Sequence, residues 1–482
     1  MRLKGTAVLP HSLVLAAPKE DKFEKTVRGL KDISLEVAKA KPDTIVLITK
    51  QGNVFEDAVG VDYASRLSGS WKLSAEAGSE EISMEKECDM GLLEEINRRA
   101  GREELPVFMV NERSAEEFGI SQELSPAAFI PLYYIDRVFP DYKIVQLTAG
   151  DLSPEVLYQV GMIVREASEA NGKDVFVLAC ADLSTNLSSD DPVYAQTAAD
   201  YDARVQADLA DTDYLSLMQL RPNIIRDAGA EDHDLILMML GMFEKIKTES
   251  KVLSFEDVEG TGSLCSVSTF MIDDKDFVVP SLLAVYEDRA AREREALRAG
   301  EHEILKMIRA ASNLWVREQR KLDFPTYASL INDQSLREEL ESRQAGVFVT
   351  VMKDGKLRGC MGSINPFGDN IGEAFINYTI EALSYDPRFM PVEEDELGRL
   401  QFTADILDIP EDVEEASELD PSIYGLIVEQ GVHRSVLLPN LPGIRTAEQQ
   451  IAEGKEKAGI SSVTLEAGEP LVMKRFRTEH FD

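Results

Sequence analysis

Cysteine is scarce in this chain, and its few cysteines lie far apart. They are Cys88, Cys180, Cys265 and Cys360, spread over 482 residues. This spacing excludes a dense disulfide framework and a zinc site built from closely spaced cysteines. Free cysteines are typical of a reducing compartment, so we expect a cytoplasmic protein.

Positive charge is also in short supply. The chain has 51 Lys and Arg against 87 Asp and Glu, which gives a formal net charge of −36. Such a charge would repel the phosphates of nucleic acids and anionic membrane surfaces, so we expect neither as a partner. No run of residues reaches the ~18 apolar positions that a membrane-spanning helix needs. Pro10 and His11 interrupt the apolar stretch 6–17, which indicates a β-strand ending at Pro10 rather than a signal peptide.

The rest of the composition, 44% apolar and 29% charged, is typical of a globular protein with two or three domains. Residues 44–49 and 174–180 are apolar runs that predict buried strands. Helical patterns are predicted near 24–40, 92–100, 154–170, 197–210 and 232–247. This alternation predicts an α/β domain in the first half, with a central sheet flanked by helices.

A cysteine between two glycines is the feature of the second half that points to chemistry. Gly359 and Gly362 flank Cys360 in a strand that follows a predicted hairpin turn at 353–356. Glycine lets the backbone approach another group closely, and Arg358 is near enough in sequence to lower the pKa of the thiol. Cys360 and Arg358 are therefore the candidate catalytic residues, and a buried structural cysteine is the alternative.

Five segments of the second half occur in a specific order. They are LRGCMGSINP, DPRFMPV, LDPSIYGLIV, LLPNLPGI and KEKAGI. Together they resemble the AMMECR family, the protein A component of the AmmeMemoRadiSam system. The resemblance implies an α+β AMMECR domain of two unequal subdomains over residues 301–482, with a site around Cys360. It also implies a radical-SAM protein as partner and an unknown small molecule as substrate.

The first half carries an ordered set of its own. The segments are VLPHSLVLAAP, PDTIVLITKQGNVFEDA, LSPAAFIPLYYI, VFVLACADLSTNL and AGAEDHDLILMMLGMF. They resemble the LigB-like class III extradiol ring-cleavage dioxygenases, and within them the Memo-type protein B of the same system. The resemblance implies a domain over residues 1–274 and a non-haem Fe(II) held by two histidines and a glutamate, a set that leaves open positions for substrate and dioxygen.

Carried over position by position, this resemblance keeps only one of five expected side chains. His11 fits the first metal ligand. The other positions hold Gln51 for the second metal histidine, Pro126 for a supporting histidine, Thr185 for the acid–base histidine and Ala230 for the ligand glutamate. Glu231 and His233 could complete a rebuilt metal site beside His11. We expect no cofactor, with Fe(II) present only if this site is functional.

Three functions are compatible with these patterns. The first is an AmmeMemoRadiSam component in which an iron-deficient Memo-like domain and an AMMECR domain are joined by a charged helical connector over 275–300. The second is an Fe(II)-dependent extradiol dioxygenase, an oxidoreductase. The third is an interaction scaffold without chemistry, in which Cys360 is structural. If the chain is an enzyme, its chemistry lies at the iron site or at Cys360.

Overall fold

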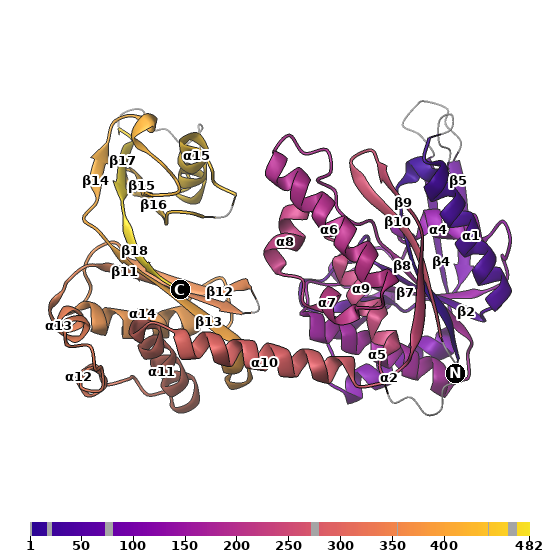
Figure 1. Cartoon of the computed structure of the whole chain (residues 1–482), viewed down its shortest axis with the longest axis horizontal. Helices are drawn as coiled ribbons and strands as arrows, with labels where there is room; N and C mark the ends of the chain where they lie inside the picture. Colours follow the sequence, from indigo (N-terminus) through magenta and orange to yellow (C-terminus); the bar gives the residue numbers. More distant parts are fainter. Residues whose placement is uncertain are drawn as a thin grey trace. The chain divides into compact units, whose positions relative to one another are not determined.

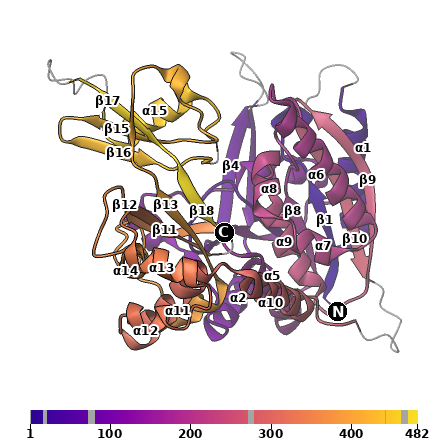
Figure 2. The ribbon, with the colours of Figure 1, turned by 60° about the vertical axis from the view of Figure 1, so that its left-hand side comes forward.

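The structure is a computed structural model of the chain (Figure 1; Figure 2 shows it turned by 60°). It describes residues 2–16, 22–72, 81–270, 279–353, 355–441, 443–460 and 470–482. The chain divides into two compact units, Met1–Ala291 and Arg292–Asp482. In the described ranges no helix is both long enough and apolar enough to cross a membrane.

The first unit is built on a mixed eight-stranded sheet. Its strands are Leu3–Leu9 (β1), Thr44–Thr49 (β2), Val59–Asp62 (β3), Val107–Val110 (β6), Lys143–Thr148 (β7), Val175–Cys180 (β8), Thr248–Val258 (β9) and Thr261–Phe270 (β10). Their order is β6-β3-β7-β2-β8-β1-β10-β9. Because β1, β8, β2 and β7 are parallel neighbours, the loops that follow them meet at one edge of the sheet.

Helices cover both faces of this sheet. They are Glu24–Ala40 (α1), Met90–Arg102 (α2), Glu112–Phe118 (α3), Pro126–Ile135 (α4), Pro154–Asn171 (α5), Pro192–Ala210 (α6), Tyr214–Met218 (α7), Pro222–Ala228 (α8) and His233–Leu240 (α9). Figure 1 shows α1 and α4 on one side of the sheet and α5, α6 and α9 on the other. Every residue of β2 and β8 is buried, as expected of strands covered on both faces. The predicted α/β class is confirmed.

Two details of the first unit differ from the sequence prediction. The helix predicted over 232–247 ends at Leu240 and continues as a 3-10 turn over Gly241–Phe243. The chain leaves helical geometry at Glu244, and Lys245 has φ 58°. A separate two-stranded hairpin, Arg66–Lys72 (β4) and Glu81–Glu87 (β5), was not predicted. The strand predicted to end at 270–272 is described as far as Phe270, and residues 271 and 272 lie outside the described ranges.

A charged helix spans the boundary between the two units. It is Leu282–Gly300 (α10), and none of its residues, all of which are described, is buried. It covers most of the stretch 275–300 that the sequence predicts as a connector; residues 275–278 lie outside the described ranges.

The second unit contains two antiparallel four-stranded sheets with separate cores. The larger subdomain comprises Gly346–Lys353 (β11), Lys356–Ser363 (β12), Leu400–Leu407 (β13) and Thr478–Phe481 (β18), with helices Glu303–Glu318 (α11), Phe324–Ala328 (α12), Gln334–Ser342 (α13) and Ile371–Ser384 (α14). The smaller comprises Glu411–Val413 (β14), Gly425–Gln430 (β15), His433–Leu437 (β16), Val472–Phe476 (β17) and the helix Ala447–Lys457 (α15). The predicted α+β class with unequal subdomains is confirmed.

Local sequence signals explain the ends of α15. Thr446 caps its start, because the Thr446 side chain accepts from the Gln449 N–H and the Gln449 side chain accepts from the Thr446 N–H. Gly459 follows its end with φ 69°, a conformation that glycine adopts without strain. Both features are local signals in the sequence.

Candidate functional site

The polar side chains of the first unit gather at the carboxyl edge of its parallel strands. His11 follows β1, Asp182 follows β8 and Lys50 follows β2. The main chain fixes this arrangement, because the Ala181 N–H donates to the Leu9 carbonyl at 2.9 Å just beyond the paired strands. This is the edge at which open α/β sheets bind ligands.

Asp232 and Asp234, the acidic segment at the start of α9, bind side chains of these three loops. His11 Nε2 lies 3.0 Å from Asp232 Oδ2 and 3.4 Å from Asp182 Oδ2. Asp232 Oδ2 also accepts from the Asp182 N–H at 3.0 Å, and Lys50 Nζ lies 2.6 Å from Asp234 Oδ2. Burial lowers the pKa of His11, but the hydrogen bond to Asp232 and the charges of Asp182 and Asp232 outweigh it and raise that pKa. The raised pKa favours the protonated form of His11 beside these two acidic side chains.

Glu231 and His233, the residues predicted to complete a metal site beside His11, bind other groups instead. Glu231 is exposed, and its carbonyl oxygen accepts from Lys50 Nζ at 2.9 Å. His233 is buried, with Nδ1 2.9 Å from the Tyr201 hydroxyl and Nε2 3.1 Å from the Leu217 carbonyl oxygen. The structure thus gives His11 a different partner, Asp232, which lies between these two candidates in the sequence. Asp232 was not among the predicted site residues, although it lies directly between two of them in the sequence.

The side chains at this edge do not fit the ferrous centre that the resemblance implies. His11 Nε2 already bonds Asp232. Ala230 has no donor atom, and Gln51 is exposed, with its main-chain oxygen accepting from the Ser125 hydroxyl at 2.6 Å. Throughout the described part of the chain, no group of three or more His, Cys, Asp and Glu side chains could hold a metal ion. Two imidazoles and a carboxylate, the set that Fe(II) requires here, are not brought together.

A cavity of about 250 Å³ opens next to Gln51. It is lined by Gly52, Asn53, Gly69, Ser70, Trp71, Ser121, Glu123, Leu124, Ser125, Pro126 and Gln146. Gln146 is buried and donates from Nε2 to Asp62 Oδ2 at 2.7 Å. Burial raises the pKa of Asp62 to about 6, although hydrogen bonds from Gln146 and Asn53 act in the opposite direction. Amides, hydroxyls and the Trp71 ring suit this cavity to a small polar molecule.

Cys360 lies on β12 in the second unit, directly opposite Thr350 of β11. The Thr350 hydroxyl donates to Cys360 Sγ at 3.3 Å. Val349 and Val351 point into the core that includes α14, so alternation places Thr350 and Cys360 on the other face of the sheet. Cys360 is half-buried, whereas the other three cysteines are buried.

The two glycines beside Cys360 allow close backbone approach, as predicted. A Cβ atom on Gly359 would lie 2.1 Å from the Ala382 carbonyl oxygen of α14. A Cβ atom on Gly362 would lie 2.3 Å from the Val347 carbonyl oxygen of β11. Any larger residue at either position would force the backbone around Cys360 to move.

The loop after α14 is tied to the cysteine through Asp386. Asp386 Oδ2 accepts from the Cys360 N–H at 2.9 Å. The half-exposed Arg388 forms a bidentate ion pair with the same carboxylate, with Nε 2.9 Å from Oδ1 and Nη2 2.7 Å from Oδ2. The hydrogen bond from Arg388 lowers the pKa of Asp386 to about 2. These contacts give a physical reason for the DPRF segment to accompany the cysteine motif.

Arg358 does not act on the thiol as the sequence predicted. The register passes from Val351 paired with Gly359 to Met352 paired with Leu357, so Arg358 is the extra residue of a β-bulge. Its guanidinium lies 3.0 and 2.9 Å from the two carboxylate oxygens of Glu396. The bulge breaks the alternation on which the prediction depended, and Arg358 anchors the loop before β13 instead.

Burial raises the pKa of the Cys360 thiol. The hydrogen bond from Thr350 and the charges of Arg388 and Lys457 act in the opposite direction without cancelling the effect of burial. The expected lowered pKa is thus replaced by a raised one. At neutral pH the site presents a protonated thiol, a hydroxyl and a guanidinium on a partly accessible face, an arrangement that can bind a polar ligand and donate hydrogen bonds to it.

Comparison with known proteins identifies both halves. Residues 5–264 match the catalytic LigB subunit of aromatic ring-opening dioxygenase, and the chain belongs to this family. Residues 307–481 match AMMECR1, so one chain joins a LigB domain to an AMMECR1 domain. Protein CA_C1420 of Clostridium acetobutylicum is 31% identical over 469 residues, which cover 96% of each chain. A protein of Thermotoga maritima is 45% identical over 140 residues, 29% of this chain and 80% of its own length.

Two solved structures are also similar to parts of the chain. The uncharacterized protein PH0010 from Pyrococcus horikoshii covers 37% of this chain and 88% of its own, with 26% identity and a TM-score of 0.31. The uncharacterized protein JW3007 from Escherichia coli K12 covers 55% of this chain and 99% of its own, with 14% identity and a TM-score of 0.37.

Proposed function

We propose that this protein is a component of the AmmeMemoRadiSam system and acts beside a radical-SAM enzyme on a small molecule. The observation that carries the proposal is the presence of a LigB domain and an AMMECR1 domain in one chain, over nearly the full length shared with the Clostridium relative. Covalent linkage keeps two domains at a high effective concentration, which is useful when both serve one substrate or one complex.

In this proposal the LigB domain works without iron. The pairing of His11 with Asp232 supports this view, since it occupies one of the two ring nitrogens that could bind a metal. The cavity beside Gln51 offers amides, hydroxyls, the acidic Glu123 and the Trp71 ring, so the domain keeps the capacity to hold a small polar molecule.

The Cys360 face is the proposed centre of the AMMECR1 domain. Cys360 and Arg388 would contact the ligand, while Asp386 and Arg358 position the surrounding loops. Because burial raises the pKa of the thiol, we infer a role in binding or proton donation rather than unassisted nucleophilic attack at neutral pH.

Co-purification tests the proposal directly. The tagged full-length chain is mixed anaerobically with the radical-SAM enzyme encoded near it in the same genome, and a tagged protein of similar net charge serves as control. We expect specific retention of the enzyme and slower alkylation of Cys360 in the complex. The Cys360→Ala variant should retain the enzyme equally well, because the thiol serves chemistry rather than assembly. Retention no greater than that of the control would contradict the proposal.

A further inference from the structure

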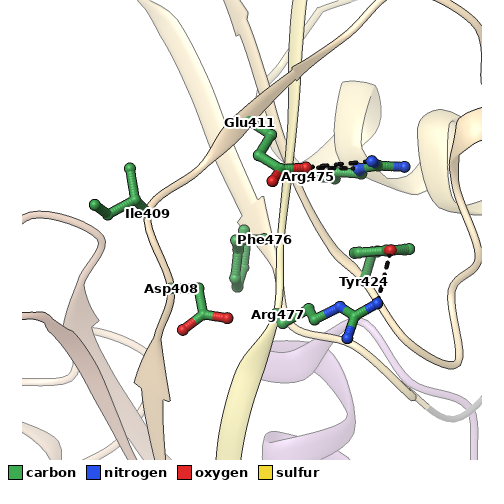
Figure 3. A pocket seen from close by; sticks show the side chains of 7 residues that line it. All are labelled: Asp408, Ile409, Glu411, Tyr424, Arg475, Phe476 and Arg477. Atoms are coloured by element: carbon green, nitrogen blue, oxygen red, sulfur yellow. Dashed lines mark hydrogen bonds and ion pairs between the residues drawn. The ribbon is translucent and has the colours of Figure 1, made fainter.

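A second pocket of the AMMECR1 unit uses charged side chains that the Cys360 site does not (Figure 3). Its volume is about 210 Å³, and it is lined by Asp408, Ile409, Glu411, Tyr424, Arg475, Phe476 and Arg477. It lies where the two connections between the sheets run side by side: residues 408–410 lead from β13 to β14, and Arg477 leads from β17 to β18. The Asp408 N–H donates to the Arg477 carbonyl at 2.9 Å and holds the two connections together.

One of the two arginines of the pocket, Arg475, is held in place by an ion pair and hydrogen bonds. Arg475 Nε and Nη2 each lie 3.2 Å from Glu411 Oε2, and Nη1 donates to the Glu418 carbonyl at 2.7 Å. The Arg475 guanidinium also lies 4.6 Å from the centre of the Tyr424 ring. Its charge is therefore balanced by Glu411, and three of its five N–H groups are used.

The other arginine keeps most of its donors. Within the described ranges, Arg477 donates from Nη2 to the Tyr424 hydroxyl at 3.0 Å, which uses one of the five N–H groups of a guanidinium. This hydrogen bond to Tyr424, together with the charge of Asp408, raises the pKa of Arg477. Asp408 is exposed, and Figure 3 marks no hydrogen bond or ion pair between it and the other residues drawn. The pocket thus combines an available guanidinium with an available carboxylate.

The remaining walls are apolar. The Phe476 ring is buried, and Ile409 is 89% exposed. Two acidic and two basic side chains line the pocket, so its formal charge is zero. A small anion would meet Asp408, Glu411 and the strongly negative chain, whereas a zwitterion carries no net charge to be repelled.

We propose that this pocket binds a free α-amino acid with an apolar side chain. The planar fork of Arg477 matches a carboxylate, Asp408 matches an ammonium group, and Ile409 and Phe476 match the side chain. A volume below the ~300–1,000 Å³ of pockets for drug-sized ligands suits a molecule of this size. The site is independent of the function proposed for Cys360, since it shares no residue with it.

Calorimetric titration of the full-length chain with L-leucine tests the proposal, with acetate and methylammonium as ligands that carry one charged end each. We expect saturable binding of L-leucine and binding at least about tenfold weaker for either fragment. R477Q and D408N should each weaken L-leucine binding about tenfold. R434Q and D412N change exposed charges of the same subdomain outside the pocket and should bind like the wild type.

Three results would overturn the inference. They are no saturable binding of L-leucine, binding of acetate or methylammonium as tight as that of L-leucine, and wild-type binding by both R477Q and D408N. Thermal unfolding identifies any variant that is not folded. In that case R477K replaces R477Q, because it keeps the charge and removes the planar fork. R477K should bind L-leucine several-fold more weakly, and unchanged binding would count against the proposal.

Discussion

The reactivity of Cys360 provides a sharp test of the AMMECR1 site, because the sequence and the structure name different arginines as its neighbour. A unit charge a few ångströms away contributes about 1 kcal/mol where solvent screens it strongly. Arg388 has a side chain that is 50% exposed, so we halve this value. The result corresponds to roughly 0.4 of a pKa unit. R388Q should therefore raise the pKa of the thiol and slow its alkylation about two- to threefold below that pKa.

Removal of the negative charge of Asp386 should have the opposite effect on the pKa of the thiol. Asp386 raises the pKa of Cys360 through its charge, so D386N should speed alkylation, and the D386N/R388Q double variant should fall near the wild type. R358Q is the matched control, since Arg358 is bound to Glu396, and it should leave the rate nearly unchanged.

Iodoacetamide labelling followed by peptide mass spectrometry between pH 7 and 9 measures these rates. Cys88, Cys180 and Cys265 are internal references: all three are buried, and burial raises the pKa of Cys88 and of Cys265 to about 12. Cys360 should react fastest of the four. An R358Q effect with no R388Q effect would refute the geometry described here, and a Cys360 rate no higher than the references would make it a structural cysteine.

Three of the remaining predictions concern the first unit and the join between the units, and one concerns the cysteine motif. Anaerobic reconstitution should leave the full-length chain without stoichiometric iron and without protocatechuate-dependent oxygen uptake; iron that is lost in H11A would contradict this. Since the pKa of His11 is raised, the contribution of His11 to stability is present below pH 6.5 and is lost as pH rises through the raised pKa. H11A should therefore lower the melting temperature more at pH 6 than at pH 9. An equal loss at the two pH values would refute this prediction. Limited proteolysis should cut first within 275–300 and leave two resistant fragments, whereas early cuts elsewhere would indicate one intertwined fold. G359A should destabilise the second unit by about 1–3 kcal/mol, because the new Cβ would contact the Ala382 carbonyl. G398A has open space around it and should not be destabilised. Equal melting temperatures of the two variants would count against this prediction.

Much of the fold could be read from the sequence because its central elements carry strong signals. The run 44–49 is apolar at its four central positions, which is what a strand buried on both faces requires. The helix 24–40 has the same limits in the structure. The helix Pro126–Ile135 was missed because it is apolar all round and contains Pro131, so it shows no amphipathic period. Val107–Val110 was missed because a short, half-buried edge strand gives little pattern.

The candidate sites were only partly predictable for a different reason. Cys360 and its glycines are adjacent in sequence, and their close packing follows from local chemistry. Asp232 lies 221 residues from His11, and nothing local indicates that loops after two neighbouring strands meet the start of α9. The direction of Arg358 depends on a β-bulge, and a bulge reverses alternation without leaving a mark in the pattern of residue types.

The charge balance at the carboxyl edge explains how the acidic side chains there are accommodated. Asp182 is buried and Asp232 is close to it, and two such carboxylates repel each other unless a positive charge lies between them. Protonated His11 supplies that charge, and Lys50 does the same for Asp234. A proton on one imidazole therefore satisfies the acidic segment at the start of α9. A divalent ion at this place would have to displace that proton, and no second imidazole lies beside His11 among the described residues, which is the basis of the proposal that the LigB domain works without iron.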